Sequence, residues 1–78
     1  MGDLESIKVF LAVAEQRSFV AAARALSMTP PSVTRSVNAL EARLGVQLLL
    51  RTTRQVSLTS AGAAYALRVA PLVQGLDD

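Results

Sequence analysis

Seven arginines supply the most distinctive chemistry in this sequence. They lie between Gln16 and Leu76, a stretch whose single acidic residue is Glu41, so this stretch carries +6 while the whole 78-residue chain carries +2. A guanidinium group is a planar fork of hydrogen-bond donors that fits phosphate oxygens and the acceptor edge of guanine. The charge distribution therefore favours a polyanionic partner over a merely solvated surface.

Groups suited to catalysis or metal binding are scarce. The sequence has no histidine, no cysteine and a single lysine, and its acidic residues form no pair on a common predicted face. Without cysteine a disulfide framework is excluded, and a zinc site would have to rest on carboxylates alone. We therefore expect no enzyme, no metal site and no cofactor.

Side chains suited to base recognition fall on one face of a helix expected from Pro30 or Pro31 to Leu44. Arg35 and Asn38 lie on that face, and these residue types pair with the edges of guanine and adenine. The opposite, buried face consists of aliphatic residues at helical spacing: Val33, Val37, Leu40 and Leu44. Gly45 then supplies the left-handed conformation that commonly ends a helix.

Two adjacent prolines open this helix. Proline is tolerated in the first helical turn, because its missing N–H has no intrahelical partner there. A residue before proline is pushed away from helical conformation, so we expect Pro30 to be extended, Pro31 to be the first helical residue and Thr29 to be a weak cap. The ring CH₂ groups that replace amide donors are suited to packing on a thymine methyl.

Two further helices are predicted before the prolines. One runs from Leu4 to Gln16 with Asp3 as its N-cap, and the short segment FVAAARAL is capped by Ser18. The tight turn SMT then leads into the proline-initiated helix, which completes a helix-turn-helix pattern whose second helix enters the major groove. The core is expected to include Phe10, Phe19, Leu26, Val37 and Leu40.

After Gly45 the helical period is lost. Residues 46–58, VQLLLRTTRQVSL, predict a strand, a polar turn and a second strand that form a basic wing. A last helix, capped by Thr59 or Ser60, is expected through Leu76, with Pro71 kinking or interrupting it.

This last helix carries two apolar stripes. One consists of Ala61, Tyr65, Val69, Leu72 and Leu76, and the other of Ala63, Leu67 and Ala70. Two apolar faces indicate two partners, the core of the chain and a second chain.

The length of the chain allows one small domain, and no apolar run reaches the roughly 18 residues that a membrane-spanning helix needs. The first residues, MGDLESIKVF, are acidic where a signal peptide is basic. We therefore expect a cytoplasmic protein without a membrane partner.

Several stretches, in this order, carry a resemblance to a known family: FLAVAEQRSFVAAARALSMT, PSVTRSVNALEARLGVQLLLRTTRQVSLTSAG and the helix from about Ser60. Over residues 4–75 the chain resembles the N-terminal DNA-binding domain of LysR-type transcriptional regulators. The resemblance implies a mainly α fold, a winged helix-turn-helix with a three-helix core, a small two-stranded wing and a C-terminal linker helix. It implies a DNA-binding domain over 1–58 and a linker or dimerisation helix over 59–78, with the sensor domain of the family and its small-molecule site absent.

The implied function is sequence-specific binding of double-stranded DNA by a bacterial regulator. Its homodimer would pair through the linker helix, and the full-length protein could form tetramers. By resemblance, the candidates for base contacts are Pro31, Ser32, Thr34, Arg35 and Asn38, while Pro30 stands where many members have a polar residue. The candidates for phosphate or minor-groove contacts are Thr29, Arg51 and Arg54, with Thr52 and Thr53 completing the wing. The expected dimer contacts are Tyr65, for which the core is the alternative, Val69, Leu72 and Leu76.

A function of another class stays open at this point. The stripe from Tyr65 to Leu76 also suits a helical protein-interaction module or an antitoxin-like dimer. Binding to duplex DNA that weakens steeply with salt discriminates the regulator from these alternatives, because neutralising phosphates releases counterions.

Overall fold

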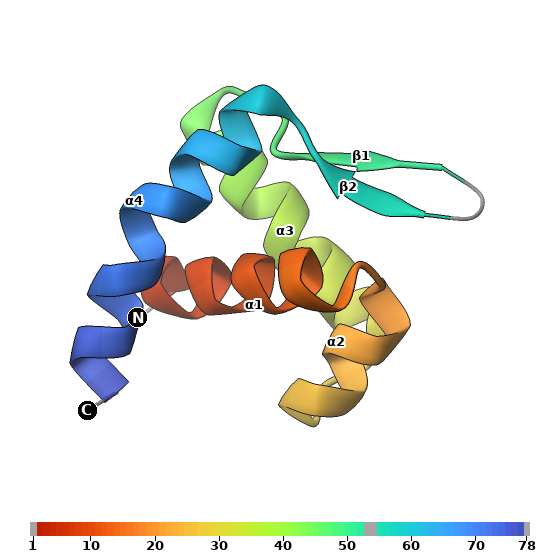
Figure 1. The fold of residues 1–78 in the computed structure, drawn as a ribbon. Coiled ribbons are helices and arrows are strands. Elements are labelled where there is room, and N and C mark those ends of the chain that lie inside the picture. The colour runs from red at the N-terminus through yellow and green to blue at the C-terminus, as the bar shows by residue number, and fades with distance from the viewer. Residues whose placement is uncertain (1, 53–54, 78) are drawn as a thin grey trace.

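The computed structural model describes residues 2–52 and 55–77 of the chain. Their elements follow in the order α1 (Gly2–Gln16), α2 (Phe19–Leu26), α3 (Pro30–Leu44), β1 (Leu49–Arg51), β2 (Val56–Leu58) and α4 (Ser60–Asp77). Figure 1 shows the β1–β2 hairpin projecting away from the helices. The winged helix-turn-helix predicted from the sequence is confirmed.

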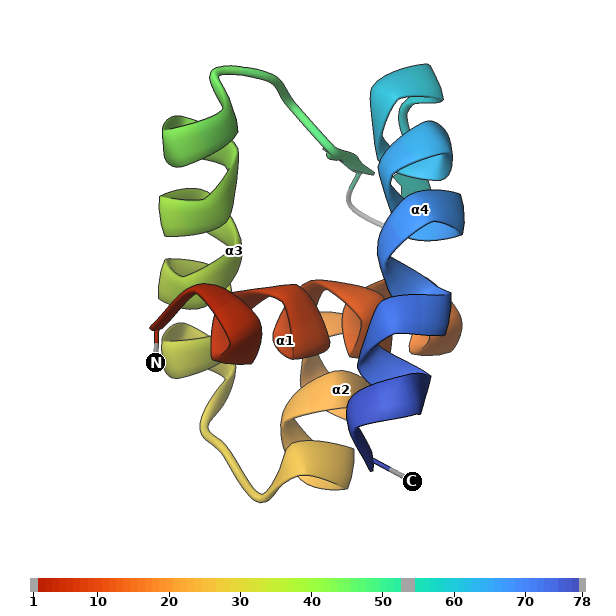
Figure 2. The ribbon, with the colours of Figure 1, turned by 90° about the vertical axis from the view of Figure 1, so that its left-hand side faces the viewer.

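Helix α1 lies at the centre of the fold. It crosses between α3 and α4 (Figure 2) and contacts α2 and β2 as well. The buried core cluster joins residues of α1, α2, α3 and the wing: Val9, Phe10, Val13, Ala22, Ala23, Val33, Val37, Leu40, Leu48, Leu49 and Val56. Phe19 and Leu26 are half-buried at its edge. Leu44 differs from the expectation, since this residue of the last turn of α3 is 40% exposed and lies outside the cluster.

The helix ends follow from local hydrogen bonds. Ser18 caps α2 as predicted, with its Oγ accepting from the N–H of Ala21 at 3.0 Å. Gly45 ends α3 in the left-handed region, with φ of 70°, and its N–H donates to the Glu41 carbonyl at 2.8 Å. Helix α1 begins at Gly2, so Asp3 lies inside the helix and the expectation that it forms the N-cap is wrong.

Both prolines belong to α3, which corrects the expectation that Pro30 is extended. Thr29 is the extended residue, with φ of −92° and ψ of 150°, and it caps the helix through a 3.3 Å bond from the Ser32 N–H to its Oγ1. The three buried residues of α3, Val33, Val37 and Leu40, fix the helix against the core. This packing and the Thr29 cap together outweigh the local preference of a residue before proline.

The wing is a two-stranded antiparallel sheet in which Leu49 lies opposite Leu58. Its base is tied to α3 by Glu41, whose Oε2 accepts from the backbone N–H groups of Leu48 at 2.7 Å and Leu49 at 3.1 Å. One carboxylate thus satisfies two backbone donors at the start of the wing, and it fixes where the wing leaves the helical core.

The start of α4 is hydrogen-bonded to the segment just before β1. Thr59 donates from its backbone N–H to the Leu48 carbonyl at 3.0 Å and from its Oγ1 to the Gln47 carbonyl at 2.7 Å. Its Oγ1 also accepts from the Gly62 N–H at 2.9 Å, which makes Thr59 the cap of α4. Gly62 lies so close to the Leu48 carbonyl that a Cβ there would overlap it.

The inward face of α4 differs from the predicted stripe. Tyr65 packs against the core, with its ring centroid 5.8 Å from that of Phe10, and Val69 and Val73 are buried. Leu72 is 67% exposed, because the buried row follows steps of four residues. In the single chain Tyr65 is half-buried beside Phe10 and Val69 is buried, and their contact with a second chain stays a prediction. The helix continues through Pro71 without the interruption that we considered.

Candidate nucleic-acid interface

The exposed N-terminal part of α3 is a connected set of hydrogen-bonding side chains. Thr29 Oγ1 donates to Ser32 Oγ at 2.8 Å, and Arg35 Nη2 donates to the same Ser32 oxygen at 3.3 Å. Pro30 and Pro31 are exposed beside them. The first turn holds no acidic residue, so the positive end of the helix dipole stays uncompensated and favours a phosphate nearby.

Farther along the same helix the predicted face is also present. Arg35 and Asn38 are exposed, Thr34 is half-buried, and the fully buried Val33 and Val37 lie on the other side of the helix. The structure thus brings together the residues of α3 that the sequence proposed for base contacts.

Arg51, a candidate for phosphate or minor-groove contact, has partners within the single chain. Its Nη2 donates to Asn38 Oδ1 at 2.8 Å and lies 3.5 Å from Glu41 Oε1, while its guanidinium carbon lies 4.8 Å from the centroid of the Phe19 ring. The side chain, 34% exposed, is therefore held between α2 and α3 by a hydrogen bond, an ion pair and a cation–π contact.

The described end of the wing is closed by Thr52 and Gln55. The backbone N–H of Thr52 donates to the Gln55 carbonyl at 2.9 Å, and the Gln55 N–H donates to Thr52 Oγ1 at the same distance. Thr53 and Arg54, also predicted at the interface, lie outside the described residues.

Sequence reasoning missed the parts of Glu41 and Phe19 in this site. Glu41 is the single acidic residue among seven arginines, and that isolation was the available signal for an internal partner. Phe19 was expected only in the core, but its ring also supports the guanidinium of Arg51. Within residues 2–52 and 55–77, no cluster of His, Cys, Asp or Glu could hold a metal ion.

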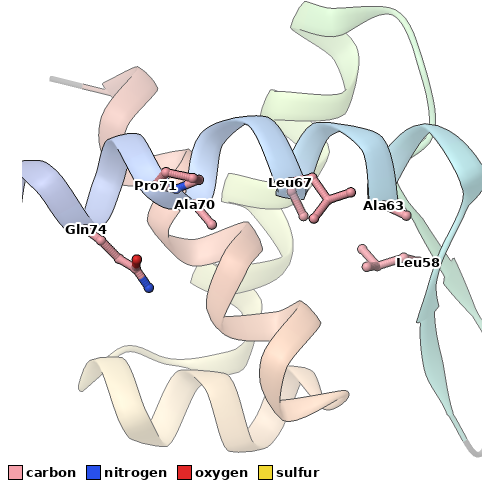
Figure 3. Close-up of a pocket in the computed structure, with 7 residues that line it drawn as sticks. Leu58, Ala63, Leu67, Ala70, Pro71 and Gln74 are labelled. Atoms are coloured by element: carbon pink, nitrogen blue, oxygen red, sulfur yellow. The ribbon is translucent and has the colours of Figure 1, made fainter.

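A separate apolar groove of about 540 Å³ runs along α4, away from the face just described. Figure 3 shows its lining, which comes from successive turns of α4 and, at one end, from Leu58 of β2. The lining residues are Leu58, Ala63, Ala66, Leu67, Ala70, Pro71 and Gln74. Leu67 is 79% exposed, so the second apolar stripe predicted for this helix is present and uncovered in the single chain.

Comparison with known proteins decides the family. Residues 4–63 match the family described as "Bacterial regulatory helix-turn-helix protein, lysR family". The chain belongs to this LysR family. The curated relatives described next are HTH-type transcriptional regulators.

Two regulators illustrate the similarity of this LysR-family chain to longer proteins. An HTH-type transcriptional regulator of Xanthomonas campestris pv. campestris is 51% identical over 63 residues, which are 81% of this chain and 18% of that protein. CrgA of Neisseria meningitidis, also an HTH-type transcriptional regulator, is 49% identical over 70 residues, which are 90% of this chain and 23% of that protein. The chain therefore spans about a fifth of the length of these relatives.

Two solved structures show the same fold. The DNA-binding domain of BenM, in complex with benA site 1 DNA, gives a TM-score of 0.90 at 35% identity over 95% of this chain and 83% of that one. The DNA-binding domain of CbnR, also in complex with DNA, gives 0.89 at 39% identity over 95% of this chain and 85% of that one. In the described part of the LysR-family chain, no helix is both long and apolar enough to cross a membrane.

Proposed function

We propose that this chain binds double-stranded DNA sequence-specifically, as the DNA-binding part of a bacterial LysR-type transcriptional regulator. Helix α3 enters the major groove, and the wing lies along the backbone or the minor groove. An α-helix fits the major groove of B-DNA, where each base pair presents its own pattern of donors and acceptors.

One observation carries the proposal. Helix α3 is anchored by the fully buried Val33 and Val37 on one side and exposes Arg35 and Asn38 on the other, with the hydrogen-bonded Thr29 and Ser32 at its start. A rigid helix with an exposed polar face meets the requirement that base-contacting groups be held in place before binding. The similarity to BenM and CbnR domains solved in complex with DNA supports DNA binding by this chain.

Within this proposal the residues divide into two groups. Pro31, Ser32, Thr34, Arg35 and Asn38 face base edges, with Pro30 at the leading edge of the helix. Thr29 and Arg54 face phosphates, and Thr52 and Thr53 complete the wing. The sequence predicts that Arg51 contacts the DNA backbone. Because its guanidinium already contacts Asn38 and Glu41, we do not include it among the proposed phosphate contacts.

We further propose that two copies pair through α4, with residues 1–58 forming the DNA-binding domain and 59–78 the dimerisation helix. The groove along α4 and the exposed Leu67 and Leu72 support this pairing, because apolar surface of this kind gains stability when it is covered. Leu76, whose side chain is outside what the structure describes, stays a predicted member of this interface. A symmetric dimer would place two recognition helices on two half-sites.

Selection from a pool of random duplexes tests the function. The 78-residue chain is incubated with the pool, bound DNA is recovered over several rounds, and the sequences are compared with those from a control without protein. The proposal requires enrichment of a motif made of two inverted half-sites. Recovery of unenriched sequences by the folded protein would contradict it.

A further inference from the structure

Arg51 donates a hydrogen bond to the side-chain amide of Asn38. The orientation of this amide decides whether Asn38 presents a donor or an acceptor to a base. The Nη2 of Arg51 lies 2.8 Å from Asn38 Oδ1. Arginine has only donors, so the oxygen of the amide, and not its NH₂ group, must face the guanidinium. The two N–H donors of Asn38 consequently point away from Arg51.

The guanidinium is itself held firmly. It pairs with Glu41 Oε1 at 3.5 Å and stacks on Phe19 at 4.8 Å from the ring centroid, so α2 and α3 both restrain it. Glu41 in turn accepts from the N–H groups of Leu48 and Leu49 through its other oxygen. The position of the wing and the orientation of the Asn38 amide are therefore parts of one hydrogen-bonded network.

A contact between a phosphate and the Nη2 group of Arg51 would compete with this arrangement. The same Nη2 that reaches Asn38 also reaches Glu41, and the charge is partly neutralised by that carboxylate. A phosphate gains less from a cation that already has an anionic partner.

We propose that Arg51 is a positioning residue, which rests on the proposed DNA-binding function and deepens it. It fixes Asn38 as a hydrogen-bond donor toward the major groove, so that Asn38 selects a base with an acceptor edge, such as guanine O6 and N7. Recognition of adenine would instead require Asn38 Oδ1, which already accepts from Arg51, to accept from adenine N6 through its second lone pair as well. Arg51 thus determines specificity without touching a base.

The test combines sequence selection with salt-dependent affinity for wild type, Arg51→Ala, Asn38→Ala and the double variant. We expect Arg51→Ala and Asn38→Ala to lose preference at the same base-pair position, by the roughly five- to hundredfold that a good base contact carries. The double variant should lose no more preference at this base-pair position than Asn38→Ala alone, since the two residues act through one contact. The slope of log K against log salt should stay unchanged in Arg51→Ala.

Two further variants control for charge and folding. Arg24→Ala removes an exposed arginine of α2, and it should leave the base preference of the selected motif unchanged. Asn38→Asp keeps an oxygen for Arg51 and removes both donors, so it should retain the melting temperature and still lose the preference at that position.

The outcomes separate this proposal from the function on which it rests. A salt slope that falls by about 0.9 in Arg51→Ala, with a uniform loss over all sequences, would identify a phosphate contact and overturn the positioning role. A preference lost at a different position from that of Asn38→Ala would overturn it as well. Wild-type protein that selects no sequence at all would overturn the proposed function, and the positioning role with it.

Discussion

At the start of α3, Thr29, Ser32 and Arg35 form a chain of side-chain hydrogen bonds that orders groups before DNA arrives. Ser32 Oγ accepts from both of its neighbours, at 2.8 Å from Thr29 and 3.3 Å from Arg35. Restricting these side chains in the free protein lowers the entropy lost on binding. The chain of bonds also directs Arg35 along the exposed face of the helix.

We therefore expect Arg35→Ala to relax sequence preference more than it weakens non-specific binding. Loss of a base contact should cost about 1–3 kcal/mol on the selected motif and far less on unrelated duplexes. Titration of both duplexes with Arg35→Ala, and with Arg24→Ala as the variant of equal charge, measures the difference. If Arg35→Ala leaves the ratio of the two affinities intact, its role in base recognition is refuted.

Arg54 should behave in the opposite way. Arg54 lies outside the described residues, but it belongs to the wing sequence RTTRQ, and we propose that it contacts a DNA phosphate. Arg54→Ala should weaken binding to all duplexes alike and flatten the salt slope by about 0.9. A change in base preference in the selection experiment would contradict this role.

Helices α2 and α3 each begin with a side-chain N-cap. Ser18 and Thr29 each accept a backbone N–H three residues ahead, and removing such a cap costs about 0.5–2 kcal/mol. Thr29→Ala and Ser18→Ala should therefore lower the free energy of unfolding by similar amounts in urea denaturation. Only Thr29→Ala should also weaken DNA binding beyond the loss of folded protein, since it removes the partner of Ser32. Equal DNA affinity of the two variants would contradict this distinction.

The junction between α4 and the wing depends on a close backbone approach. A Cβ at Gly62 would overlap the Leu48 carbonyl, whereas nothing lies within 4 Å of one at Gly75 in the same helix. Gly62→Ala should cost about 1–3 kcal/mol through strain, and Gly75→Ala should be neutral or stabilising by up to about 1 kcal/mol. Thermal unfolding of both variants gives the comparison. A Gly62→Ala protein as stable as Gly75→Ala would show that the junction has room for a methyl group.

Over the whole molecule, α4 has one side against the core and the other uncovered. Leu67→Asp, at the most exposed large apolar side chain that the structure describes, should give folded monomers in sedimentation, because it places a charge in the proposed dimer interface. Val20→Asp, also at an exposed position but on α2, should leave the dimer intact. Tyr65→Asp should unfold the chain, since Tyr65 packs on Phe10. A Leu67→Asp dimer of normal strength would place the interface elsewhere.

The sequence predicted the helix-turn-helix and the wing because local signals mark their ends: Ser18, the two prolines, Gly45 and the polar turn RTTRQ. It could not assign the inner face of α4, where apolar residues occupy two sides and periodicity alone does not distinguish core from partner. It also could not foresee the contact between Arg51 and Asn38. That contact joins residues 13 apart in sequence and depends on where Glu41 holds the wing.

We propose that this face binds duplex DNA through sequence-specific contacts and phosphate neutralisation together. The most direct test of this claim is the affinity of the folded chain for its selected duplex and for a scrambled duplex, measured by fluorescence anisotropy from 50 to 200 mM salt. We expect tighter binding to the selected duplex at every salt concentration, with affinity falling about a hundredfold over the range if four phosphates are neutralised. Equal affinities for the two duplexes, or no binding by the folded protein at 50 mM salt, would contradict the claim.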